Sequence, residues 1–123
     1  MMLSKVEALK FKMRIFSLKN ISPEPVSHNK DIFKKVIIKK GIVPHLMMFS
    51  QVVFKPKQIA SAHIHKDMYE TFFVEEGEGI FKVNGKGYRL HVGNCIVIEP
   101  GESHEVENSG KRNLVLTYFG IAE

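Results

Sequence analysis

Apolar residues in this chain gather in short runs, and turn-forming residues separate the runs at intervals of about ten positions. Such runs, rich in Val, Ile, Phe and Met, predict β-strands. The predicted strands cover 33–39, 46–54, 71–74, 80–83, 88–92, 95–98, 103–107 and 114–119. Short strands in this number, with turns between them, are typical of an all-β sandwich or barrel.

Glycine, proline and asparagine mark the turns between these strands. Asn84-Gly85 is a strong signal for a type I′ hairpin turn, because both central residues of that turn need positive φ. The Gly-Glu-Gly at 77–79 and the Gly-Lys-Gly at 85–87 are also interpreted as hairpin turns. They do not fit phosphate-binding loops, since neither opens a helix after a strand and no Gly-Lys-Ser/Thr follows.

The first part of the chain follows this pattern poorly. Residues 1–20 are predicted to form an N-terminal extension with a leading strand, because Arg14 begins a strand-like alternation that runs to Leu18. Residues 1–12 have a helix-compatible composition and are a dispensable extension if Met13 is an alternative start. The Ser-Pro-Glu-Pro at 22–25 is expected to break any regular element. Residues 21–123 are then expected to form a single domain.

The composition, 123 residues with 44% hydrophobic and 25% charged, is typical of one globular domain and not of a disordered chain. No apolar stretch approaches the roughly 18 residues of a membrane span, so no membrane partner is expected. The single cysteine, Cys95, cannot form an internal disulfide and is expected to be buried as a small hydrophobic residue. The start of the chain lacks the apolar segment of a secretory signal, so the expected location is the cytoplasm.

The net charge of +5 is unevenly distributed along the chain. Basic residues concentrate near the start and between residues 30 and 40, whereas acidic residues concentrate at 70–78 and 99–107. A nucleic-acid-binding protein needs a basic stripe at its working surface. Here the basic segments lie away from the histidine-rich middle of the chain, so they are interpreted as lysines solvating exposed strands. Nucleic acid is therefore not expected as a partner.

Three histidines and one glutamate stand at spacings that suit a metal site. His63 and His65 point the same way on a strand, because residues i and i+2 share one face. Glu70 follows after enough residues to turn a corner, and His104 follows a Pro-Gly turn that can bring back a distant strand. Such a donor set suits a divalent ion of Mn, Fe, Co, Ni, Cu or Zn. Spacing alone leaves a structural role equally open. The other histidines lack such spacing and are interpreted as surface or structural residues: His28, His45 and His91.

The residues around these four positions resemble the two motifs of the cupin superfamily. Residues 63–77 match the first motif, G(X)5HXH(X)3-4E(X)6G, except that Lys57 stands where its first glycine is expected. Residues 93–108 match the second motif, G(X)5PXG(X)2H(X)3N, except that its proline and glycine are adjacent. The spacer between the motifs, 78–92, has the short length of compact microbial cupins. The loop entering the first motif is expected to differ, but no ligand position is lost.

This resemblance implies an all-β cupin double-stranded β-helix, a jelly-roll barrel, with a short N-terminal extension. It also implies one divalent transition metal per chain, held by His63, His65, Glu70 and His104. The implied function is a metal-dependent oxidoreductase or isomerase, dioxygenase-like or isomerase-like, acting on a small organic molecule in the barrel cavity. The alternative is a non-catalytic metal- or ligand-binding module. A sugar-phosphate isomerase or epimerase ranks last, because the strand faces around the motifs show no inward basic residue to hold phosphate.

Strand parity extends these expectations to further residues. If Glu70 points into the barrel, Phe72 and Val74 point inward as well, and Phe72 lines the cavity. The apolar, β-branched stretch at 33–38 would be an exposed edge, so a homodimer that pairs this edge across a two-fold axis is predicted. An enzyme also needs a proton-handling residue near the metal. The candidates are Tyr118, Tyr69, Gln51 and His45.

Overall fold

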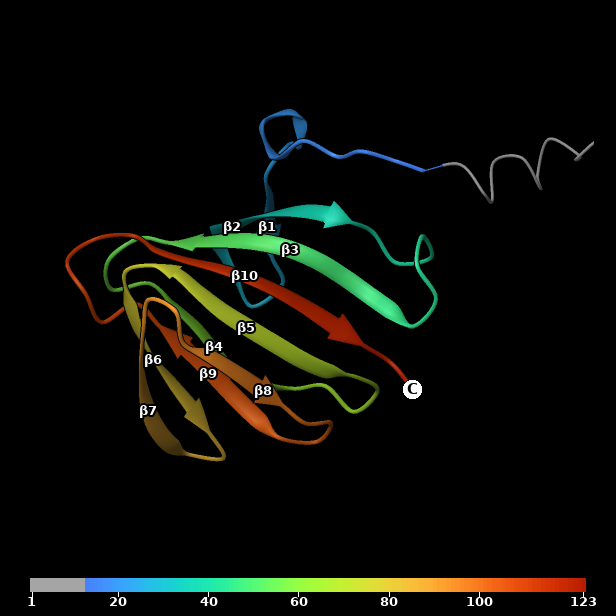
Figure 1. Cartoon of the computed structure of the whole chain (residues 1–123). Coiled ribbons are helices and arrows are strands. Elements are labelled where there is room, and N and C mark those ends of the chain that lie inside the picture. Colours follow the sequence, from blue (N-terminus) through green and yellow to red (C-terminus); the bar gives the residue numbers. More distant parts are fainter. Residues whose placement is uncertain (1–12) are drawn as a thin grey trace, which may run out of the picture.

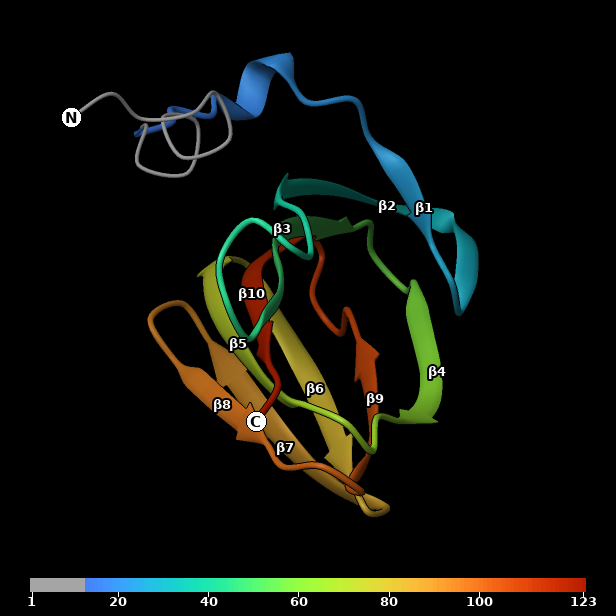
Figure 2. The same ribbon diagram turned by 90° about the vertical axis from the view of Figure 1, so that its right-hand side faces the viewer.

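The computed structural model describes residues 13–123, which form two antiparallel β-sheets facing each other (Figure 1). The larger sheet has six strands in the order β1 (Glu24–Val26), β2 (Asn29–Ile38), β3 (Leu46–Phe54), β10 (Leu114–Ile121), β5 (Tyr69–Glu76) and β8 (Cys95–Ile98). The smaller sheet has four strands in the order β4 (Ile59–Ile64), β9 (Ser103–Glu107), β6 (Glu78–Val83) and β7 (Lys86–His91). Figure 2 shows the strands of both sheets arranged around one interior, as in a jelly roll whose two sheets remain separate.

The strand boundaries follow the local apolar pattern closely. β3, β8 and β9 have the predicted bounds, and the other predicted strands are present with ends shifted by up to four residues. Asn84 and Gly85 join β6 to β7 with φ values of 51° and 82°, the positive values that the predicted hairpin turn needs. The predicted all-β fold class is confirmed. Among residues 13–123, no helix is long and apolar enough to cross a membrane.

Inward-pointing side chains of both sheets form the core. On β3, Val52 and Phe54 are buried while Val53 between them is only half-buried, as the two-residue period requires. Leu114 and Leu116 on β10 meet Phe81 from the smaller sheet, and all three are fully buried. Each such side chain contributes about 1.5–3 kcal/mol on burial. This apolar core therefore stabilises the fold independently of the histidine cluster.

The N-terminal part of the described chain differs from the prediction. Arg14 to Leu18 forms no strand; a 3-10 turn at Leu18–Asn20 follows instead, and the first strand, β1, begins at Glu24. β1 includes Pro25, within the sequence that was expected to break any regular element. Proline fits here because β1 is the edge of its sheet, where the missing N–H needs no partner. The expectations for residues 1–12 lie outside the described residues.

Two local predictions are wrong because they depend on which strands become neighbours. Gly77 is not in a hairpin turn, because β5 belongs to the larger sheet and β6 to the smaller, so the chain crosses between the sheets here. A Cβ atom at Gly77 would collide with the backbone carbonyl of Asn113, which makes glycine necessary at this crossing. Cys95 is exposed rather than buried, because Ile96 and Ile98 occupy the inward positions of the edge strand β8.

Lys57 occupies the position where the resemblance expects glycine, and its backbone adopts the conformation that favours glycine. Its φ is 72°, in the left-handed region, and its N–H donates to the Asn108 carbonyl at 3.2 Å. The loop entering the first motif therefore keeps a glycine-type conformation with a lysine in it. Residues with a Cβ atom are strained in this region.

Replacing this lysine should relieve the strain. We expect Lys57→Gly to raise the free energy of unfolding by roughly 0.5–1 kcal/mol, because the left-handed penalty exceeds the extra chain entropy of glycine. Lys55→Gly is the matched control, because Lys55 is also exposed but has no positive φ, and it should lower the free energy of unfolding. Urea denaturation of the three proteins measures both changes, and an equal loss in both variants would contradict strain at Lys57.

Candidate metal centre

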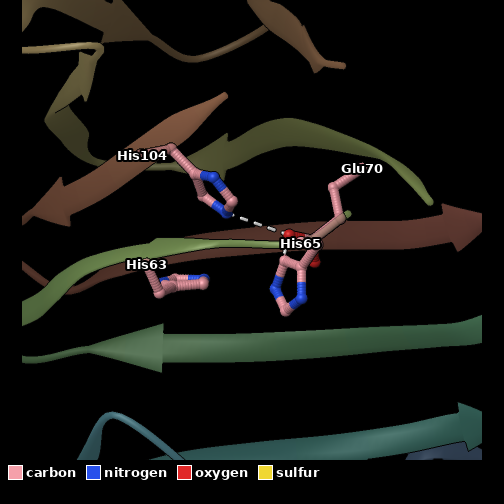
Figure 3. Close-up of side chains that lie close together, drawn as sticks. All are labelled: His63, His65, Glu70 and His104. Carbon is pink, nitrogen blue, oxygen red and sulfur yellow. Dashed lines mark hydrogen bonds and ion pairs between the residues drawn. The ribbon is translucent and has the colours of Figure 1, made fainter. Parts of the chain in front are cut away.

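Four potential metal ligands from the two sheets meet in the interior (Figure 3). His63 lies in β4 and His104 in β9, and these strands pair so that the two histidines are opposite each other in register. His65 follows the end of β4, and Glu70 comes from β5 of the facing sheet. Strand pairing and the corner between β4 and β5 thus bring together residues that are distant in the sequence.

The distances within this cluster are short. One ligand atom from each residue lies within 4.8 Å of those from the other three. Oε1 of Glu70 is 3.0 Å from Nε2 of His104 and 3.2 Å from Nε2 of His65. The ring centroids of His63 and His104 are 4.2 Å apart. The structure therefore places all four residues that the sequence singled out in one group.

Burial is uneven across the cluster. Glu70 and His104 are 4% and 1% exposed, whereas His63 and His65 are half-buried. The side formed by His63 and His65 is therefore the one that a small molecule can reach.

Backbone carbonyls determine the tautomers of two of the imidazoles. Nδ1 of His63 lies 2.9 Å from the Ser61 carbonyl, and Nδ1 of His104 lies 3.2 Å from the Glu102 carbonyl. Because a carbonyl can only accept a hydrogen bond, both Nδ1 atoms carry a proton and donate it. Nε2 of each neutral ring is left with a lone pair, as in histidines that bind metals in proteins.

Burial and neighbouring groups shift the pKa values of two of the rings in opposite directions. Burial lowers the pKa of His63 to about 4, so this ring is neutral at physiological pH. Burial also acts to lower the pKa of His104, but hydrogen bonds to Glu70 and to the Glu102 carbonyl outweigh it and raise the pKa above its usual value. His104 therefore holds a proton against Glu70 more readily than a free histidine does.

The four donors fit a divalent transition metal ion. A neutral His104 turns its Nε2 lone pair toward a carboxylate oxygen 3.0 Å away, and two acceptors in contact require a proton or a cation between them. Three imidazole nitrogens with one carboxylate suit the ions from Mn to Zn, whereas Mg and Ca prefer oxygen ligands alone. Both the spacing of the atoms and their chemistry are thus suitable for such an ion.

A cavity of about 110 Å³ lies against the cluster. Its walls are largely apolar and include Met48, Val52 and Phe72, so the predicted position of Phe72 is confirmed. The volume is well below the roughly 300–1,000 Å³ of pockets for drug-sized ligands. The cavity therefore suits a small molecule.

Tyr118 also lines this cavity, unlike the other candidates for a proton-handling residue, Tyr69, Gln51 and His45. Burial and the charge of Glu70 raise the pKa of Tyr118 to about 12. Its hydroxyl consequently stays protonated at neutral pH. Tyr118 can donate a hydrogen bond into the cavity but is unsuited to act as a base.

Two further lining residues were not identified from the sequence. His28, interpreted above as a surface or structural residue, stacks on His63 with ring centroids 3.9 Å apart and an angle of 16° between the planes. Lys34 reaches the cavity from β2, which lies outside the two motifs, so a basic residue faces the cavity after all. Only the alternation of the strand could have indicated that Lys34 points inward, because Lys34 lies two residues after Ile32, which is fully buried.

The β1–β2 hairpin brings His28 to the site. The Asn29 side chain donates to the Ile59 carbonyl at 3.0 Å, and the Gln58 side chain donates to the Asp31 carbonyl at 2.9 Å. These bonds hold the hairpin against β4 and the loop before it, where Figure 2 shows the hairpin approaching β4. Contacts between segments so far apart in the sequence have no local signature.

Known proteins resemble this chain in sequence and in fold. Residues 50–120 match the cupin domain family. The oxalate-binding protein of Thermotoga maritima is 27% identical over 99 residues, which cover 76% of this chain and 82% of the relative. The solved structure of a predicted oxalate decarboxylase from Thermotoga maritima has a TM-score of 0.82 at 23% identity, covering 89% of this chain and 100% of that chain. The polyketide cyclase RemF from Streptomyces resistomycificus has a TM-score of 0.77 at 16% identity, with coverages of 91% and 81%.

The likeness to these two solved structures is below 25% identity and shows the fold alone. The match to the family is stronger evidence of common ancestry, because it spans more than half of the chain and includes all four cluster residues. The chain therefore belongs to the cupin domain family.

Proposed function

We propose that this cupin binds one divalent transition metal ion per chain, drawn from Mn, Fe, Co, Ni, Cu and Zn, through His63, His65, Glu70 and His104. We further propose that it is a metal-dependent enzyme, an oxidoreductase or isomerase, acting on a small organic molecule. The observation that carries this proposal is the convergence of four suitable donor atoms, all within 4.8 Å of one another, beside a small cavity.

The residues around the cluster have distinct roles in this proposal. A bound ion of this kind supplies a Lewis acid that polarises an oxygen of the substrate. The apolar wall, with Val52 and Phe72, excludes water from the substrate. Tyr118, with its pKa of about 12, donates a hydrogen bond from a protonated hydroxyl. His28 packs on His63 and orients its ring.

The name of the Thermotoga maritima relative, an oxalate-binding protein, supports a small chelating acid as the ligand. The same name favours a second candidate function, a non-catalytic module that binds metal and ligand. The two functions differ in turnover, because an enzyme consumes its acid and a module returns it unchanged. Incubating the metal-loaded chain with oxalate and measuring the remaining acid distinguishes them for this ligand.

The proposed setting is the cytoplasm, with a small molecule as the partner and no role for nucleic acid or a membrane. The single cysteine supports this setting, because it cannot form the internal disulfide that is common in oxidising compartments.

Removing one imidazole from the cluster should abolish stoichiometric metal binding. His65→Ala and His104→Ala each delete a nitrogen donor that the ion needs. Both variants should keep the circular dichroism of a β-sheet protein, because the apolar core lies between the sheets. Elemental analysis of protein purified without a histidine tag measures the metal. One tightly bound ion per chain in either variant would overturn the site.

Two histidines outside the donor set provide graded controls for this measurement. His91→Ala should leave metal binding unchanged, because His91 lies on β7 and pairs with Glu78 away from the cluster. His28→Ala should retain one ion per chain but weaken its affinity by up to about tenfold, because the stacking that orients His63 is lost. His28→Phe keeps an aromatic ring and should recover most of the affinity. An unchanged affinity in His28→Ala would show that the stacking has no orienting role.

Metal affinity should fall as the pH is lowered, because protons compete with the ion for its ligands. His63, with a pKa of about 4, stays available through most of this fall. His104 must lose its proton when the metal ion binds, and its pKa is raised. The fall in metal affinity should therefore begin above about pH 6.5, the reference pKa of histidine. Titration with Zn²⁺ over roughly pH 5 to 8, with the released protons counted, tests this. A constant affinity over that range would contradict it.

We also propose that two chains pair through β2. β1 pairs with β2 only at Asn29, Phe33 and Lys34, so within the described chain the outer edge of residues 35–38 has no strand partner. The unpaired strand edge was predicted over residues 33–38 and is observed over residues 35–38. It is still largely apolar, which favours pairing with the same edge of a second chain. Light scattering at micromolar concentration should give twice the chain mass, and Ile37→Lys should give the single mass. A monomeric unmodified chain would contradict the proposal.

A further inference from the structure

The β1–β2 hairpin forms one wall of the cavity, and it lies outside residues 50–120 that match the cupin domain. Val26, Ser27, His28 and Lys34 of this hairpin all line the cavity. The hairpin thus contributes wall residues that the family match does not account for. Among these four, only Lys34 carries a permanent charge.

Lys34 faces the interior by strand parity and by register. Ile32, two residues earlier on β2, is fully buried, and Val52, opposite Lys34 on β3, is buried and lines the same cavity. Lys34 itself is half-buried. Its methylene stem can lie along the apolar wall while its ammonium group stays at the cavity, as long basic side chains commonly do.

The ammonium group of Lys34 has no ion-pair partner among residues 13–123. Glu24 is its register partner on β1, yet the two side chains form no ion pair. The next residue, Lys35, faces the other side of the strand and donates to the Leu18 carbonyl at 3.1 Å. A positive side chain that lines a cavity and forms no ion pair favours the binding of an anion there.

We propose that Lys34 is a specificity-determining residue that binds a second carboxylate of the ligand, so that the cavity takes short dicarboxylates. This rests on the proposed function, in which the first carboxylate binds at the cluster. The position of Lys34 supports it, because Lys34 adds to the cavity wall a positive charge that is separate from the cluster. A dicarboxylate can bind at both places, whereas a monocarboxylate can bind at only one. The cavity volume of about 110 Å³ favours a short acid.

The experiment uses matched acids that differ in one charge: malonate and its monoamide, and succinate and its monoamide. In calorimetric titrations, the Zn²⁺-loaded chain should bind at least one dicarboxylate about tenfold or more tightly than its monoamide. Lys34→Met should lose this preference, and Lys34→Arg should retain most of it. Lys35→Met is the matched control, because it removes the same charge from the opposite face of the same strand, and it should keep the preference.

The Zn²⁺ content of each protein is measured first, and Lys34→Met should hold as much as the unmodified chain. A preference that survives Lys34→Met, or that Lys35→Met loses equally, would overturn the inference and leave the proposed function intact. A chain that binds no metal would refute the proposed function. In that case, titration of the metal-free chain with malonate tests whether Lys34 binds a carboxylate. Binding that Lys34→Met abolishes supports the inference; binding that persists in Lys34→Met, or no binding at all, overturns it.

Discussion

The candidate site depends on one contact, between the carboxylate of Glu70 and the imidazole of His104. Glu70 belongs to the larger sheet and His104 to the smaller, and their Oε1 and Nε2 atoms lie 3.0 Å apart. Both residues are almost completely buried, and a buried charge without compensation is strongly destabilising. A proton or another cation must therefore lie in this contact. Whichever is present also links the two sheets.

The surrounding structure allows this compensating cation to change while the fold persists. Phe81, Leu114 and Leu116 form an apolar core that does not include the cluster. The Nδ1 protons of His63 and His104 are held by backbone carbonyls, so the main chain orients the lone pairs before any ion binds. A site held in this way is preorganised, because its supporting hydrogen bonds come from the main chain of β4 and of the residue before β9.

The sequence is sufficient for the features that depend on neighbouring residues. Local alternation predicts the bounds of β3, β8 and β9, and motif spacing identifies the four cluster residues. It is insufficient where one segment meets another far along the chain. Cys95 is exposed because the core lies on the face of β8 that carries Ile96 and Ile98, and His28 stacks on His63 because the hairpin reaches β4. Strand parity with Ile32 puts Lys34 on the inward face of β2, but only the packing of the hairpin beside the cluster makes Lys34 part of the cavity wall.

Part of the cavity wall comes from a segment that carries none of the four donors, and this bears on ligand choice. β4, β5, β9 and the residue that follows β4 carry the cluster, whereas the β1–β2 hairpin contributes His28 and Lys34 to the wall. Solved structures with this fold include a polyketide cyclase and a predicted oxalate decarboxylase, so the fold alone does not determine the ligand. Replacing Lys34 would change the charge of the wall without removing any of the four donors. The ligand that this cupin takes can therefore depend on the hairpin as well as on the cluster, because separate segments carry the two.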